Sequence, residues 1–317
     1  MKKKISIIIP AYNEQDNLPH VYARLNDLFA NQLPGYELEA IILDNSSSDK
    51  TEEIASAFAL QDQRWKYIRY SRNFGADVSM TAGLDFATGD AVVNLFSDLQ
   101  DPPETIPLFV KEWERGAEVV NGVVKVRNDS SFFKTLGARM AYALISSLSE
   151  CDIVPGATDF RLLDRKVVNV LRTMKESDRY MRGLVGWVGF KRAVVSYDRQ
   201  PRERGASNAN LIHCLGYAFN AIICFSGKPL QIATIFGFSL TLLSILLGVV
   251  YFVLHFIHPA FMSVAPAGIT TIILLLTFGL GVQSLFLGLI GEYLARVYNQ
   301  GKGRPLYVVD RLEGFVG

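Results

Sequence analysis

The chain has 317 residues, half of them hydrophobic, and a formal net charge of +1. A charge balance this close to neutral argues against nucleic-acid binding, which normally requires a basic excess. The three cysteines and four histidines show no metal-ligand spacing, so they support no cysteine or histidine metal site. The length is enough for one globular domain and a membrane anchor, and the hydrophobic residues are concentrated toward the C-terminus.

Short apolar runs alternate with helical patterns through the first half of the chain. The expected strands are residues 5–10, 38–43, 65–70, 91–96 and 118–124, and the expected helices are residues 14–30, 50–61, 75–87 and 103–114. Strands and helices that alternate at this spacing predict an α/β fold with a mostly parallel sheet covered by helices on both faces.

Polar, acid-bearing segments follow three of these strands, at residues 11–14, 44–49 and 97–101. Ligands of such sheets bind beyond the carboxyl ends of the strands, so the three segments should converge on one rim. Asp44 is expected to accept a hydrogen bond from a base or a ribose. The alternative is a simple turn, in which Asp49 caps the next helix.

The third of these segments carries Asp98, Gln100 and Asp101. Their side-chain oxygens are the hard ligands that Mg²⁺ or Mn²⁺ prefers. A divalent ion there would bridge a diphosphate and offset the charge that grows on a leaving nucleotide. The alternative is a loop that only caps the helix beginning near Pro103.

Two long uncharged stretches, residues 232–257 and 267–290, contain 26 and 24 residues. Crossing about 30 Å of hydrocarbon takes about 20 apolar residues, so the pattern predicts a two-helix transmembrane hairpin. The loop at 259–266 carries no charge, whereas basic residues flank the two stretches: Lys228, Arg296, Lys302, Arg304 and Arg311. The positive-inside rule therefore places both termini and the N-terminal domain in the cytoplasm, at an inner or plasma membrane.

These patterns divide the chain into a cytosolic domain at 1–209, an interfacial amphipathic helix at 210–228, the hairpin at 229–295 and a cytosolic tail at 296–317. A second apolar-rich segment, 132–148, also suits a helix in the membrane interface, although for both segments a core helix is an equal alternative. Small residues in the second span, Gly279, Gly281, Gly288 and Gly291, predict a homo-oligomer, with a tetramer as one form. The alternative is that these glycines pack only against the first span.

Several local motifs occur together: Ser-Arg-Asn-Phe-Gly at 71–75, Ser-Asp-Leu-Gln-Asp-Pro-Pro-Glu at 97–104, Thr-Asp-Phe-Arg-Leu at 158–162 and Gly-Glu-Tyr-Leu-Ala-Arg at 291–296. With them, nearly the whole chain resembles the polyprenyl-phosphate glycosyltransferases. These are GT-A-fold enzymes similar to dolichyl-phosphate mannose synthase, and the paired spans match the bacterial branch of the family.

The resemblance implies inverting transfer of a hexose from a nucleotide sugar to a polyprenyl phosphate, with glucose, UDP-glucose and undecaprenyl phosphate as the favoured identities. It assigns nucleotide-sugar binding to Pro10, Tyr12, Glu14, Asp44 and Asp98. It assigns the Mg²⁺ or Mn²⁺ cofactor to Asp98 and Gln100. The catalytic residues that it implies are Asp98, Asp159 and Arg161.

The acceptor phosphate needs basic partners, and the candidates are Arg127, Lys134, Arg139, Arg202, Arg204 and Ser207. The alternative for Lys134 and Arg139 is that they extend toward lipid headgroups. A phosphate monoester has a second pKa near 6, so at neutral pH it is already largely a dianion and needs no strong base. Asp159 is therefore expected to orient sugar hydroxyls or Arg161 rather than to remove a proton.

The sequence departs from the family pattern at Phe96, Ala76 and Asn208, where the family has an aspartate, often a lysine, and a lysine. These departures leave open a catalytically weakened scaffold that binds a nucleotide sugar. A polysaccharide synthase is a further alternative, but two spans are too few to enclose a polymer path. The Gln-x-x-Arg-Trp motif of such synthases occurs at 61–65, on the wrong side of the acidic segment.

Overall fold

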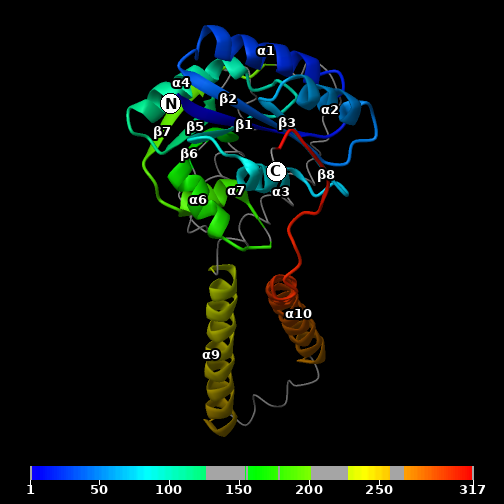
Figure 1. Cartoon of the computed structure of the whole chain (residues 1–317). Helices are drawn as coiled ribbons and strands as arrows, with labels where there is room; N and C mark the ends of the chain where they lie inside the picture. Colours follow the sequence, from blue (N-terminus) through cyan, green and yellow to red (C-terminus); the bar gives the residue numbers. More distant parts are fainter. Residues whose placement is uncertain are drawn as a thin grey trace. The chain divides into compact units, whose positions relative to one another are not determined.

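The computed structural model describes residues 2–125, 154, 156–177, 179–200, 228–257 and 268–315 (Figure 1). The chain divides into two compact units. The first comprises Met1–Ala221 together with Arg304–Gly317, and the second comprises Ile222–Gly303.

A single sheet forms the centre of the first unit, with strands in the order β7-β5-β6-β4-β1-β2-β3-β8. The strands are β1 (Lys3–Ala11), β2 (Tyr36–Asp44), β3 (Trp65–Tyr70), β4 (Ala91–Asn94), β5 (Val119–Val124), β6 (Ala157–Asp164), β7 (Arg192–Tyr197) and β8 (Val309–Glu313). Parallel pairs join β1 to β2 and β4, β2 to β3, and β5 to β7. Strand β6 runs antiparallel to β4 and β5, and β8 runs antiparallel to β3. The predicted α/β fold with a mostly parallel sheet is confirmed.

Helices cover both faces of this sheet (Figure 1). They are α1 (Leu18–Asn31), α2 (Thr51–Gln61), α3 (Ala76–Phe86), α4 (Ile106–Glu114), α6 (Arg165–Thr173) and α7 (Met181–Trp187), with a short 3-10 turn, η1 (Pro103–Thr105), before α4. Ile5, Ile7 and Ile9 of β1 are fully buried in one core with α1 and α4. Burying each such side chain stabilises the fold by about 1.5–3 kcal/mol. Ile8 faces the other way, against Gly83 of α3, where an added Cβ would lie 2.9 Å from it.

The tail after the second unit returns to the first unit and ends as β8, at the edge of the sheet beside β3. Tyr307 donates a hydrogen bond to Asp85 at 3.0 Å, and the ring of Phe315 lies 5.4 Å from that of Phe86. Gly314 has φ +77°, and a Cβ there would lie 2.6 Å from the carbonyl oxygen of Trp65, so a larger residue would push the strand away. The end of the tail is therefore docked on the sheet of the first unit.

The second unit contains two long helices, α9 (Lys228–Ile257) and α10 (Gly268–Gly301). The rings of Phe236 and Phe286 meet edge to face, with centroids 6.1 Å apart. Within the described residues, one segment, Phe278–Gly301, is long and apolar enough to cross a membrane, judged by length and composition alone. The hairpin of two spans therefore stays a prediction.

The glycines of α10 leave open space around the helix. A Cβ added at any of them would meet no described atom within 4 Å: Gly279, Gly281, Gly288 and Gly291. In the described part of the chain these glycines are therefore not used for close packing against α9. The homo-oligomer stays a prediction.

Candidate active site

The loops that follow β1, β2 and β4 share an uncommon backbone feature. Each contains one non-glycine residue in the left-handed region: Asn13 at φ 56°, Ser46 at φ 60° and Leu99 at φ 55°. No other non-glycine residue in the described ranges has a positive φ. This conformation costs about 1–2 kcal/mol per residue, and such strain clusters at functional sites. Backbone strain therefore singles out the same three loops that the sequence predicted to carry the site.

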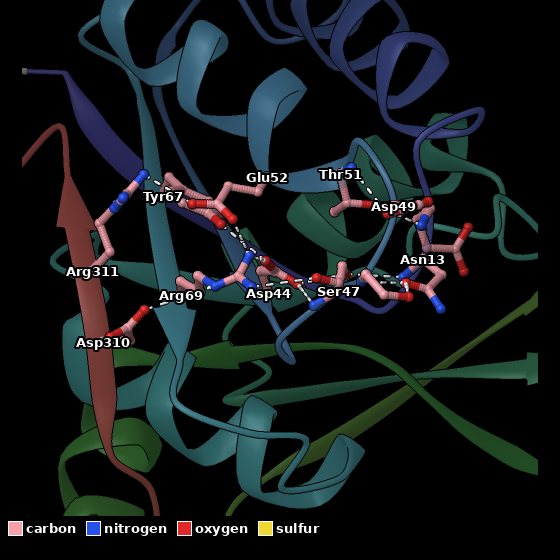
Figure 2. Close-up of polar contacts among 12 residues, drawn as sticks. Asn13, Asp44, Ser47, Asp49, Thr51, Glu52, Tyr67, Arg69, Asp310 and Arg311 are labelled. Carbon is pink, nitrogen blue, oxygen red and sulfur yellow. Dashed lines mark hydrogen bonds and ion pairs between the residues drawn. The ribbon is translucent and has the colours of Figure 1, made fainter.

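The first two loops are joined by reciprocal hydrogen bonds (Figure 2). The Asn13 amide donates to Ser47 Oγ at 3.0 Å, and the Ser48 amide donates back to Asn13 Oδ1 at 2.9 Å. One residue further along, the Glu14 amide donates to Thr51 Oγ1 at 2.8 Å. These bonds satisfy backbone donors that would otherwise need water, so the two loops form one ordered platform.

Asp49 fills the helix-capping role that the sequence offered for it. Its Oδ1 accepts from the Thr51 amide at 3.0 Å, in the first turn of α2, and its Oδ2 accepts from the Gln15 amide at 3.2 Å. Burial raises the pKa of Asp49, but these hydrogen bonds outweigh burial and hold it below the ordinary value of 3.8. The carboxylate therefore stays charged at neutral pH and caps the helix.

Asp44, the last residue of β2, is fully buried. The Ser47 amide and Ser47 Oγ donate to its Oδ1 at 2.8 Å and 2.5 Å. Tyr67 donates to its Oδ2 at 2.9 Å, and Arg69 lies 3.2 Å from the same oxygen. Both carboxylate oxygens thus have partners inside the protein, so Asp44 shapes the serine-rich loop in this conformation. Its direct contact with a nucleotide stays a prediction.

An aromatic side chain stands exposed on the same rim. Tyr12 has 49% of its surface exposed, whereas Pro10, two residues earlier, is buried and its carbonyl oxygen accepts a 3.0 Å hydrogen bond from Ser97 Oγ. That bond ties the β4 loop to β1. An exposed ring on an ordered loop is suited to stacking against a nucleobase, and the nucleotide-sugar binding expected of Tyr12 stays a prediction.

The β4 loop holds the predicted metal ligands on a tight turn. Leu99 lies between them in the left-handed conformation with its side chain buried, and the Gln100 amide donates to Asp98 Oδ1 at 3.2 Å. Asp101 is buried and already paired, with Tyr197 at 2.6 Å and Arg199 at 3.3 Å. Burial raises the pKa of Asp101, and the neighbouring carboxylates Asp98 and Asp159 add to that rise.

This donor set fits a divalent ion that is held mostly by its substrate. The described residues contain no group of three or more His, Cys, Asp or Glu side chains arranged to hold a metal. Asp98 and Gln100 can supply one carboxylate and one amide oxygen. Mg²⁺ is commonly bound through one or two carboxylates, substrate phosphates and water, so one carboxylate and one amide are compatible with such a site, and the assignment to Asp98 and Gln100 stays a prediction.

Asp159 and Arg161 lie on β6, where Arg161 is the cross-strand neighbour of Asn94. Asp159 is 8% exposed and forms ion pairs with two arginines, Arg161 at 3.0 Å and Arg182 of α7 at 2.6 Å. Burial raises the pKa of Asp159, but the hydrogen bonds and charges of Arg182 and Arg161 outweigh burial, and the pKa lies below its ordinary value. A carboxylate held in its charged form by arginines is a poor proton acceptor, which favours the orienting role.

Comparison with known proteins identifies the family. The model of glycosyl transferase family 2 matches residues 6–172. The chain belongs to glycosyl transferase family 2. It is 37% identical to "Uncharacterized glycosyltransferase sll0501" of Synechocystis over 99% of this chain and 97% of the relative. It is 33% identical to "Prophage bactoprenol glucosyl transferase homolog" of Escherichia coli over 98% of this chain and 99% of the relative.

Similarity to solved structures is weaker. Mannosyl-3-phosphoglycerate synthase from Rubrobacter xylanophilus aligns over 69% of this chain and 72% of that chain, with a TM-score of 0.48 and 15% identity. The assignment to glycosyl transferase family 2 rests on the sequence relatives and the family model, not on this alignment.

The structure of this glycosyltransferase also reveals site residues that the sequence did not indicate. Arg182, which donates hydrogen bonds to Asp159, lies 23 residues later in the chain, on α7. Asp77, in the first turn of α3, accepts a 3.1 Å hydrogen bond from the Met181 amide, at the start of that same helix. Burial, followed by the charge of Asp159, raises the pKa of Asp77 to about 6. No local motif marks these contacts, because each joins segments that are distant in the sequence.

The predicted site residues fall into two groups. Those of the donor and metal sites lie on the joined loops after β1, β2 and β4, and Asp159 and Arg161 lie on the strand next to β4. The lipid-phosphate candidates all lie outside the described residues: Arg127, Lys134, Arg139, Arg202, Arg204 and Ser207. The two expected interfacial helices, at 132–148 and 210–228, also lie outside the described residues, with the exception of Lys228.

Proposed function

We propose that this glycosyltransferase transfers glucose from UDP-glucose to undecaprenyl phosphate or a similar polyprenyl phosphate, with inversion, at the cytosolic membrane face. The observation that carries the proposal is the similarity to a bactoprenol glucosyl transferase homologue over 98% of this chain, which includes both compact units. A relative that matched only the first unit would support glycosyltransferase activity but would not indicate the acceptor. The match across the second unit extends the argument to the lipid.

The donor binds, in this proposal, on the platform formed by the loops after β1 and β2. Tyr12 stacks on the base, because it is the exposed ring on that platform. The diphosphate lies toward Asp98 and Gln100. A divalent ion, Mg²⁺ or Mn²⁺, supplies positive charge that stabilises the leaving diphosphate when it is bound there.

The acceptor phosphate attacks the anomeric carbon from the side opposite the leaving nucleotide, which inverts the configuration. Because a phosphate monoester is largely a dianion at neutral pH, no side chain has to remove a proton. In this proposal Asp159 orients Arg161 and Arg182 toward the sugar, and its 3.0 Å and 2.6 Å contacts with the two arginines support that role. Positioning and charge stabilisation then supply most of the rate.

Membrane attachment through α9 and α10 is part of the proposal, with both termini in the cytoplasm. Lys228 is the first residue of α9, and Arg296, Lys302 and Arg304 follow the apolar part of α10, which agrees with that orientation. Attachment of this kind would hold the first unit where the phosphate of a membrane lipid is accessible. The residues that receive this phosphate stay a prediction.

The test is a transfer assay with the full chain purified in detergent. Undecaprenyl phosphate, Mg²⁺ or Mn²⁺, and a panel of radiolabelled UDP- and GDP-sugars are supplied, and label is counted in the organic phase. We expect label from UDP-glucose, its loss in Asp98→Ala, and no loss in Asp27→Ala, a matched change at an exposed carboxylate of α1. If label came from a different donor, the sugar of that donor would replace glucose in the proposal. Nucleotide binding without transfer from any donor would favour the scaffold.

A further inference from the structure

Strand β8 is connected to the end of β2 through paired residues of β3, the strand between them. In the sheet, Asp44 of β2 is the cross-strand partner of Arg69 of β3, and Arg69 is the partner of Arg311 of β8. Directly paired residues point to the same face of a sheet, so these charged side chains form one row. Figure 2 shows this row running from the tail to the serine-rich loop.

Arg69 stands at the centre of the row and contacts both sides. It lies 3.2 Å from Asp44, and its guanidinium also donates to the carbonyl oxygen of Ser47 at 3.4 Å. Toward the tail, it lies 3.8 Å from Asp310 and forms a short ion pair with Glu52 of α2. The planar guanidinium has donors in several directions, which suits a residue that links separate elements.

Glu52 joins Arg69 to the tail. Two arginines opposite each other on neighbouring strands repel, which would weaken the pairing of β8 with β3. Glu52 neutralises this repulsion, because it pairs with Arg69 and also accepts from Arg311 at 2.9 Å. Ser56, one turn further along α2, donates to Glu313 at 2.5 Å. The tail is therefore fixed to α2 as well as to β3.

The first turn of α2 faces the tail and the site loops at once. Thr51 Oγ1 accepts a hydrogen bond from the Glu14 amide of the first loop at 2.8 Å. The next residue, Glu52, forms an ion pair with Arg311 of the tail. A displacement of this turn would change both contacts together. The chain of contacts from Arg311 through Glu52 and Arg69 to Asp44 is continuous in the structure.

We propose that β8 positions the donor-binding loops, with Arg311, Glu52 and Arg69 as positioning residues that act through Asp44 and Thr51. The proposal rests on the proposed function, because it takes these loops to be the donor platform. The segment that follows the second long helix thereby helps to determine how well the donor is held. None of the three residues touches the reacting atoms.

The kinetic test uses the full chain with UDP-glucose and undecaprenyl phosphate. Glu52→Gln removes the bridging charge with little change of shape, and Arg311→Ala removes one partner. We expect the KM for UDP-glucose to rise about tenfold in Glu52→Gln and about threefold in Arg311→Ala, which corresponds to about 1.4 and 0.7 kcal/mol. The kcat and the KM for undecaprenyl phosphate should change less than about twofold.

Two further variants separate positioning from a general loss of stability. Arg311→Lys keeps the charge and should restore most of the donor affinity. Arg115→Ala removes an arginine whose side chain is 62% exposed, compared with 52% for Arg311. Its ion pair with Glu112 lies at the C-terminal end of α4. This matched control should leave both KM values unchanged. An equal rise of both KM values in Arg311→Ala, or no rise in Glu52→Gln, would overturn the proposal.

A second measurement does not depend on activity. Hydrogen exchange of the full-length protein in detergent reports on the amides of Asn13, Glu14, Ser47 and Ser48, which are all hydrogen-bonded within the platform. Faster exchange at these amides in Glu52→Gln and Arg311→Ala, but not in Arg115→Ala, is the expected result. Unchanged exchange would overturn the proposal. If the wild-type protein transfers no sugar, the proposed function fails while this measurement still decides the coupling.

Discussion

Two buried aspartates of the site, Asp44 and Asp159, are held by different kinds of structure. Asp44 ends a strand and pairs with Arg69, its direct neighbour on the next strand, so the register of the sheet fixes the contact. Asp159 instead depends on Arg182, which is supplied by a short helix, α7. That helix is held in turn by the hydrogen bond from the Met181 amide to Asp77 of α3.

The difference shows how each half of the site can respond to change. A contact fixed by strand register can move only if strands separate, which breaks several backbone hydrogen bonds at once. A contact made by one side chain from a seven-residue helix can change when that helix shifts. The donor half should therefore be ordered before substrate binds, whereas the half around Asp159 can adjust as the sugar and the acceptor arrive.

The largest expected effect is at Asp159. Asp159→Ala leaves the buried Arg161 and the partly exposed Arg182 without their counter-charge, and we expect a loss of transfer of more than about 100-fold and of about 3 kcal/mol of stability. Because its pKa lies below the ordinary 3.8, the ion pairs of Asp159 contribute stability at neutral pH that is lost only as the pH falls through that lower value. Thermal unfolding followed across acidic pH, beside a transfer assay, measures both effects. Retention of most activity would remove Asp159 from the catalytic set.

The next effect separates the two aspartates. Asp44→Asn keeps the shape of the side chain but removes the charge that faces Arg69, so we expect about 2–3 kcal/mol of destabilisation. The donor KM should rise about tenfold with a smaller change in kcat, because the serine-rich loop loses its support. Steady-state kinetics with varied UDP-glucose measures this split. A fall in kcat as large as that in Asp159→Ala would mean that the two aspartates do not act in different halves of the reaction.

Tyr12 tests the donor half without altering its core. Tyr12→Ala should raise the donor KM about tenfold, since stacking of a base on an aromatic ring contributes about 1–3 kcal/mol. The ring is half exposed, so the melting temperature should hardly change. Tyr12→Phe keeps the ring and should behave like the wild type in binding of UDP by calorimetry. Equal losses in the Phe and Ala variants would indicate a role for the hydroxyl instead of stacking.

The smallest effect concerns Asp77, and it is expected at neutral pH but not at acidic pH. With a folded pKa of about 6 and an ordinary value of 3.8, this carboxyl binds more protons in the folded than in the unfolded protein between these values, so its ionisation lowers stability as the pH rises through that window. Asp77→Asn keeps an acceptor for the Met181 amide and should stabilise the protein by about 1–2 kcal/mol near pH 7.5. The gain should vanish below about pH 4. Thermal unfolding at a series of pH values measures it, and a gain that is independent of pH would contradict the assignment.

The sequence predicted the parallel half of the sheet because its signals are local. Each of β1, β2 and β3 is a short apolar run, and a helical pattern follows it, so position along the chain also gives position in the sheet. The same reasoning identified the three loops of the rim. It could not identify their left-handed residues, since Asn13 is a common choice for that conformation but Ser46 and Leu99 are not.

Strands β6, β7 and β8 were not predicted, for a physical reason, whereas β5 was expected at 118–124. Strand β6 inserts between β4 and β5, and β7 pairs with β5, so their neighbours are set by contacts that are distant in the chain. Strand β8 is further still, and three of its five residues are charged (Asp310, Arg311 and Glu313), as is common in an exposed edge strand. Arg182 and Asp77 escaped notice for the same reason, because their partners are identified only after these elements have packed.

The position of β8 in the chain also affects the order of synthesis. Ser56 and its partner Glu313 are separated by 257 residues, which include both long helices. At about 5–20 residues per second, a ribosome needs tens of seconds to make that interval. During this time β3 is an open edge, available to other strands, and the sheet is incomplete. The nascent chain can therefore complete the sheet of its first unit only after both long helices have been synthesised.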